Sequence, residues 1–102
     1  MHILATELES IVEYLFPPVT IDVSWNNALV IDKIIVATSV RNQGIGTEVM
    51  KYICVYANNN KVSVILTPDG TFGGDVIRLR EFYKRFGFVE RDNRSLIRLP
   101  RG

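Results

Sequence analysis

Apolar residues recur along this chain in the two periods that distinguish helices from strands. Within the first sixteen residues they return every three or four positions, which predicts a helix that Pro17-Pro18 ends. The residues on this apolar face are Leu4, Leu8, Ile11, Val12 and Leu15. Between Val19 and Trp25 every second residue is apolar, which predicts a strand that is buried on one side.

The following segments predict a hairpin and then a long helix. Asn26-Asn27 favours a tight turn, so the strand predicted from Ala28 to Val36 pairs with the first strand. A helix is predicted from Gly44 to Ala57, and Asn58-Asn59-Asn60 closes it. Its core-facing residues are Ile45, Val49, Ile53 and Tyr56.

The last third of the chain predicts three more elements around a glycine-rich loop. Val62 to Leu66 is a continuous apolar run, typical of a central strand. After the loop from Thr67 to Gly74, Asp75 is a candidate N-cap for a helix through Phe86, with Gly87 as the residue that ends it. A terminal hairpin follows. Its two strands are Phe88 to Glu90 and Ser95 to Leu99.

This order predicts an α/β or α+β fold, in which helices cover a mixed, mainly antiparallel sheet. With 102 residues, 47% of them hydrophobic, the chain can bury one modest core, so residues 1–102 are expected to form a single domain. The N-terminal segment carries Glu7, Glu9 and Glu13 and lacks a basic start. It therefore resembles neither a signal peptide nor a membrane span, and we expect a cytoplasmic protein.

The single cysteine and the single histidine offer little chemistry. Cys54 has no partner for an internal disulfide and falls inside a predicted helix, which favours a buried thiol over a nucleophile. His2 and Cys54 have no nearby partners at ligand spacing, so no metal site is expected.

The segment from Val36 to Thr47 has the features of an anion-binding turn. An apolar strand ends, Gly44 and Gly46 follow, and an amphipathic helix begins, so backbone N–H groups of its first turn can point at a phosphate. The segment is not a P-loop, because Thr47-Glu48 stands where lysine and serine or threonine are needed. It is not a Rossmann fingerprint, because Val49 replaces the third glycine or alanine.

Two motifs in order resemble the GNAT superfamily of acyl-CoA N-acyltransferases. Arg41, Gly44 and Gly46 fall in the register of its Arg/Gln-x-x-Gly-x-Gly/Ala motif, behind a strand that ends in Val36. Downstream, the segment Leu79 to Phe88 resembles the family's helix that ends in Phe-Tyr-x-x-x-Gly-Phe. The resemblance spans about Leu29 to Leu99 and implies a GNAT-like sheet. Family members usually begin with a further strand and a second helix, which are missing here and which commonly wall the acceptor site.

The resemblance implies acetyl-CoA as co-substrate. The backbone amides that would bind its pyrophosphate are those of Arg41, Asn42, Gln43, Gly44, Ile45, Gly46 and Thr47. The strand end at Ile35 and Val36 would pair with the pantetheine arm. Two departures from the family pattern, Thr38 for a frequent proline and Asn42-Gln43 for Gly-Lys, remove no backbone donor. Val76 replaces an asparagine that contacts the cofactor in the family, so one polar contact is expected to be missing.

Attack of an amine on a thioester requires a proton for the leaving thiolate and a base for the amine. Tyr83 is the candidate acid, because a phenol with a pKa near 10 stays protonated at neutral pH. Core packing is the competing role for its ring. Asp32 is the candidate base, expected on the strand face of Ile34 and Val36, although a role at the hairpin edge is also open. The amide of Val36 is a candidate donor to the oxyanion.

These features predict an acetyl-CoA-dependent N-acetyltransferase that acts on an amine, such as a protein lysine or N-terminus. The alternatives are a non-catalytic acyl-CoA-binding or adaptor module, and a phage-type inhibitor that acetylates a host nuclease.

Net charge is +1, but residues 78–102 hold eight Lys/Arg and three Asp/Glu. This basic segment is expected to be a solvated surface, with contacts to CoA phosphates or nucleic acid as alternatives. Arg91, Arg94, Arg98 and Arg101 would serve nucleic acid, and a homodimer could supply the missing wall.

Overall fold

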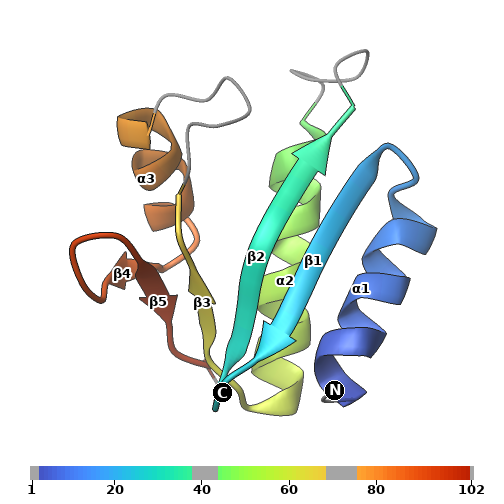
Figure 1. The fold of residues 1–102 in the computed structure, drawn as a ribbon, viewed down its shortest axis with the longest axis horizontal. Coiled ribbons are helices and arrows are strands. Elements are labelled where there is room, and N and C mark those ends of the chain that lie inside the picture. The colour runs from blue at the N-terminus through green and yellow to red at the C-terminus, as the bar shows by residue number, and fades with distance from the viewer. Residues whose placement is uncertain (1–2, 38–43, 69–75, 102) are drawn as a thin grey trace.

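The computed structural model describes residues 3–37, 44–68 and 76–101. Three helices and five strands follow one another in the order α1, β1, β2, α2, β3, α3, β4 and β5 (Figure 1). The helices are α1 (Ile3–Leu15), α2 (Ile45–Asn60) and α3 (Val76–Lys84). The strands are β1 (Val19–Trp25), β2 (Leu29–Val36), β3 (Val64–Leu66), β4 (Val89–Glu90) and β5 (Leu96–Arg98).

The strands form one sheet in the order β1-β2-β3-β5-β4. β2 and β3 are parallel, and the pairs β1–β2, β3–β5 and β4–β5 are antiparallel. The parallel pair lies at the centre, where α2 makes the crossover connection that two parallel strands require. This arrangement confirms the mixed, mainly antiparallel sheet predicted from the sequence.

The core lies between the sheet and the helices α1 and α2. Leu8 and Val12 of α1, Ile53 of α2 and Ile21 of β1 are at most 1% exposed and belong to one apolar cluster. The two helices also contact each other, because the Tyr56 hydroxyl donates to the carboxylate of Glu7 at 2.7 Å. None of the described residues of α3 is buried.

Helix α1 also covers the outer edge of β1, beside which it runs in Figure 1. The backbone N–H of Val23 donates to Glu9 at 2.6 Å, and that of Ile21 donates to Glu13 at 3.0 Å. An edge strand exposes such N–H groups to pairing with other chains. Here two carboxylates of α1 occupy these donors.

The element boundaries differ from the predicted ones mostly at helix and strand ends. α2 continues to Asn60, three residues beyond the predicted end at Ala57. It stops at Lys61, which takes a left-handed φ of 56° and donates its N–H to the carbonyls of Ala57 and Asn58. α3 ends at Lys84 instead of Phe86, and Gly87 takes a φ of 92°, as expected of the residue that ends a helix. The predicted N-cap Asp75 lies outside the described residues.

A β-bulge in β2 changes which side chains share a face. Asp22 pairs with Lys33 and Val23 pairs with Ile31, so Asp32 is an extra residue in β2. Ile34 therefore lies opposite the buried Ile21, on the core side, whereas Asp32 and Lys33 are both exposed. The prediction that Asp32 shares a face with Ile34 and Val36 is wrong, because the inserted residue resets the alternation.

Candidate active site

The first turn of α2 follows an N-cap residue that has no side chain. Gly44 is this N-cap residue, with a φ of 78°, so it supplies no side-chain hydrogen bond to the helix start. The first helical bond runs from the N–H of Glu48 to the carbonyl of Gly44 at 3.1 Å. The preceding N–H groups, those of Ile45, Gly46 and Thr47, are therefore the donors that a helix start offers to an anion.

The space around this helix start fits a ligand close to the backbone. Among the described residues, no atom lies within 4 Å of a Cβ built on Gly44, so these residues leave room beside it. A Cβ built on Gly46 meets Cζ of Phe82 at 3.8 Å, an ordinary contact that places α3 against the start of α2. The predicted phosphate-binding residues Arg41, Asn42 and Gln43 lie outside the described residues.

Strands β2 and β3 diverge below this helix start (Figure 1). Their pairing ends at Ile31 and Leu66, although β2 continues to Val36. Ala37 donates its N–H to the carbonyl of Pro18, on the β1 side. Because N–H groups alternate along a strand, those of Ile34 and Val36 face the divergent side, whereas that of Ile35 faces β1. Of the two residues predicted to pair with pantetheine, Val36 has this orientation.

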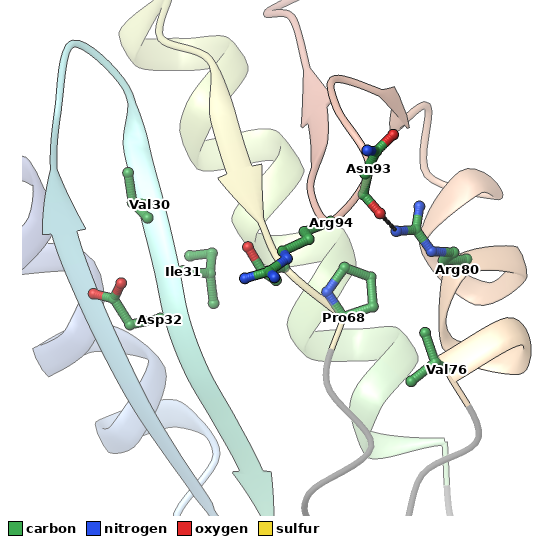
Figure 2. A pocket seen from close by; sticks show the side chains of 9 residues that line it. Val30, Ile31, Asp32, Pro68, Val76, Arg80, Asn93 and Arg94 are labelled. Carbon is green, nitrogen blue, oxygen red and sulfur yellow. Dashed lines mark hydrogen bonds between the residues drawn. The ribbon is translucent and has the colours of Figure 1, made fainter.

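A pocket of about 450 Å³ lies where β2, the end of β3, α3 and the β4–β5 turn meet (Figure 2). It is lined by Val30, Ile31, Asp32, Thr67, Pro68, Val76, Arg80, Asn93 and Arg94. The bulge brings the predicted base Asp32 to one wall of this pocket. Arg80 and Asn93 were not predicted as site residues, and Arg94 was considered only for nucleic acid, because no spacing in the sequence brings α3 and the β4–β5 turn to β2.

Tyr83 does not line this pocket, but it lies on the same side of α3. It follows Val76 by seven residues and Arg80 by three, which places all three along one stripe of the helix. Its ring is partly buried, with ring centroids 5.4 Å from Phe82 and 6.1 Å from Phe88. Burial raises the pKa of the Tyr83 phenol above its ordinary value, so the group is protonated at neutral pH.

The basic C-terminal segment is not a uniform surface. Arg98 is 4% exposed, and its guanidinium donates to the carbonyl of Phe86 at 2.8 Å and to Oδ1 of Asn58 at 2.9 Å. It joins β5 to α2 and to the end of α3. The inclusion of Arg98 in a nucleic-acid surface is therefore wrong, whereas Arg91, Arg94 and Arg101 are exposed.

Neither a metal centre nor a membrane-spanning helix emerges from the part of the chain that the structure describes. No three His, Cys, Asp or Glu residues gather there in a group that could hold a metal ion. No described helix has the length and apolar character needed to cross a bilayer. Cys54 is buried, as predicted, and burial raises the pKa of its thiol.

The sheet is mixed and mainly antiparallel, with a parallel pair beside the start of α2, and this arrangement is GNAT-like. A family model for the acetyltransferase (GNAT) domain matches residues 5–90. The chain therefore belongs to the GNAT acetyltransferase family. No curated protein matches it at a significant level.

Three solved structures have a similar fold. The crystal structure of the anti-CRISPR protein AcrVA5 has a TM-score of 0.64 and 22% identity, over 79% of this chain and 90% of that one. A GNAT-family acetyltransferase from Staphylococcus aureus Mu50 has a TM-score of 0.56 and 21% identity, over 81% of this chain and 58% of its own. A GNAT-family protein from Bacteroides thetaiotaomicron has a TM-score of 0.58 and 16% identity, over 82% and 55%. This chain thus spans little more than half the length of the last two.

Proposed function

We propose that this protein is an acetyl-CoA-dependent N-acetyltransferase whose acceptor is an amine, as on a protein lysine or N-terminus. One observation carries the proposal. The start of α2, where Gly44 is in a left-handed conformation and the described residues leave room beside it, stands next to the divergent end of β2. The N–H groups at the helix start suit the pyrophosphate of acetyl-CoA. The strand edge of β2 suits the extended pantetheine arm, which carries amide groups.

Within this proposal, acetyl-CoA supplies an acetyl group activated as a thioester. The protein positions acetyl-CoA through two backbone segments. The N–H groups of Ile45, Gly46 and Thr47 bind the phosphates. The backbone of Ile34, on the divergent side of β2, hydrogen-bonds to the pantetheine arm. The acceptor nitrogen then forms a bond to the acetyl carbon as the carbon–sulfur bond breaks. The amine loses one proton, and the sulfur gains one.

Tyr83 and Asp32 are proposed to handle these two protons. The raised pKa of Tyr83 keeps its phenol protonated, which suits a donor to the departing sulfur. Asp32 lines the pocket on the bulge of β2, where its carboxylate can take a proton from the acceptor directly or through water. These two roles require the reacting atoms to lie between the pocket and the start of α2.

Calorimetric titration with acetyl-CoA tests the cofactor site through one glycine. Gly44→Glu puts a negative side chain into the open room beside the helix start, and we expect micromolar binding to disappear. Gly44→Ala is the matched control. It carries the strain of a left-handed φ, roughly 1–2 kcal/mol, without the charge, so a folded Gly44→Ala protein should still bind.

A second control adds the same charge at the other end of α2. Asn59→Glu places a glutamate at an exposed position away from the helix start, so its affinity should stay close to that of the unchanged protein. If the folded, unchanged protein does not bind acetyl-CoA, the acetyltransferase proposal fails and the adaptor alternative takes its place.

The anti-CRISPR likeness favours a narrower version of the same function. The match covers 79% of this chain and 90% of AcrVA5, so the two folds correspond over most of both chains. A protein lysine on a host nuclease is therefore the second candidate acceptor. Acetylation of a purified CRISPR nuclease, followed by intact-protein mass spectrometry, tests it: a mass gain of one acetyl group supports it, and an unchanged mass contradicts it.

A further inference from the structure

The pocket brings together opposite charges that are not neutralised by each other. Asp32 lies on the β2 wall, and Arg94 reaches in from the β4–β5 turn (Figure 2). Among the described residues, neither the Asp32 carboxylate nor the Arg94 guanidinium forms an ion pair within 4.0 Å. A single cavity therefore has an acidic wall and a separate basic wall.

The turn that carries Arg94 is held in place by several hydrogen bonds. The Asp92 carboxylate accepts the N–H groups of Arg94 and Ser95, both at 2.8 Å. Across the pocket wall, Arg80 of α3 donates to the carbonyl of Asn93 at 2.9 Å. These contacts fix the backbone at Arg94, so its cation is presented to the cavity without the cost of ordering a loop.

Arg80 adds a second cation to the basic wall, but its guanidinium already forms an ion pair. Its Nη1 lies 3.6 Å from Oε1 of Glu90, which also pairs with Lys84 at 3.6 Å. Arg80 is thus a positioning residue for the turn. Arg94 is the cation available to a ligand.

We propose that the acceptor carries a carboxylate next to its amine, with the amine at Asp32 and the carboxylate at Arg94. This inference rests on the proposed acetyltransferase function and names its acceptor class. Before transfer the ammonium is attracted to Asp32 and gives up a proton there, whereas a carboxylate on the same molecule pairs with Arg94. An acceptor with a second cation in place of the carboxylate meets repulsion from Arg94.

Two sources share this chemistry: a free amino acid, and a lysine beside an acidic residue of a polypeptide. The experiment compares capped peptides in which one lysine is flanked by glutamates, glutamines or arginines, together with free lysine and free glutamate. CoA release gives kcat/KM for each acceptor. Amide chemical shifts of the labelled protein report acceptor binding without turnover.

We expect kcat/KM to be at least tenfold higher for the glutamate-flanked peptide than for the arginine-flanked one. Arg94→Glu should reverse that order, with little change in the KM for acetyl-CoA. Arg85→Glu is the matched control, since it makes the same charge change at an exposed position directly after α3 that does not line the pocket. It should leave the order unchanged. Faster acetyl transfer to a free amino acid than to any peptide would identify a free amino acid, and not a polypeptide lysine, as the acceptor.

The outcomes separate this inference from the function on which it rests. Equal kcat/KM for the three peptides overturns the acceptor class and leaves acetyl transfer standing. Without turnover, shifts at Asn93 and Arg94 that appear with the glutamate-flanked peptide and vanish in Arg94→Glu support the charge-paired site, while the acetyltransferase proposal fails. Absence of both turnover and selective shifts overturns the inference as well.

Discussion

The carboxylate of Glu9 accepts a hydrogen bond from the backbone N–H of Val23 at 2.6 Å, which ties α1 to the outer edge of the sheet. Glu13 makes the equivalent bond to Ile21. Two side chains of α1 thus occupy backbone donors of the edge strand, which makes these donors unavailable for pairing with another chain.

Removing both carboxylates should therefore expose a strand edge. We expect Glu9→Ala combined with Glu13→Ala to lower the free energy of unfolding by roughly 1–3 kcal/mol, because two hydrogen bonds to charged acceptors are lost. The freed N–H groups should also promote association between chains. Chemical denaturation and analytical ultracentrifugation measure the two effects. Glu81→Ala, at an exposed position on α3, is the control and should change neither. An unchanged stability of the double variant would contradict the role of the edge carboxylates.

Arg98 should matter to stability and not to nucleic-acid binding. Arg98→Leu leaves the carbonyl of Phe86 without this donor and removes the bond to Asn58 in a buried setting. We expect a loss of about 2–3 kcal/mol in the free energy of unfolding, measured by urea denaturation. Arg91→Leu is the matched control, since Arg91 is exposed and pairs with Asp92 on the surface. An equal effect in both variants would argue against the buried network.

Cys54 should be unreactive in the folded protein. Burial raises the pKa of its thiol, although Arg98 and Arg101 oppose the shift. We expect a thiol reagent at pH 8 to label the native protein only as fast as it unfolds, and to label it at once in denaturant. Rapid labelling of the native protein would place the thiol at the surface instead.

The same pKa shift has a consequence for stability. A thiol whose pKa is higher when folded contributes stability that is complete below the ordinary pKa of about 8.5 and is lost as pH rises through the folded value. The unfolding free energy of the unchanged protein should therefore fall more steeply above pH 9 than that of Cys54→Ala, which lacks this group.

Most elements could be predicted because their signals are local. The alternation of Val19 to Trp25 and the Asn26-Asn27 turn gave a correct hairpin, since neighbouring residues decide both. The bulge at Asp32 was not predictable in this way. It depends on how β2 pairs with β1, and the sequence of β2, two apolar runs around Asp32-Lys33, does not by itself show which residue is the extra one.

The candidate site was predictable only where one segment forms it. The glycines at the start of α2 lie together in sequence, so the turn into this helix at Gly44 could be predicted from them. The pocket joins Asp32, Arg80 and Arg94 from three separate elements, and their approach depends on the divergence of β2 from β3. From the sequence, Arg98 could not be distinguished from the exposed arginines near it. Its burial depends on a contact with Asn58, 40 residues away.

Tyr83→Phe tests the proposed proton donor most directly. Within the described part of the chain the Tyr83 hydroxyl makes no hydrogen bond, so its loss should leave the fold and acetyl-CoA affinity nearly unchanged. Turnover should fall by roughly 10²-fold or more if the phenol donates to the leaving sulfur. Tyr14→Phe, at a position 82% exposed, is the control and should turn over normally.

The pH profile separates this role from simple packing. Because burial raises the pKa of Tyr83, the phenol stays protonated as pH rises to its ordinary value near 10, and turnover should show no loss of this acid between pH 7 and about 9.5. A packing role would leave kcat of Tyr83→Phe equal to that of the unchanged protein at every pH. Equal kcat values with equal acetyl-CoA affinity would therefore remove Tyr83 from the chemistry and leave its ring as a support for Phe88.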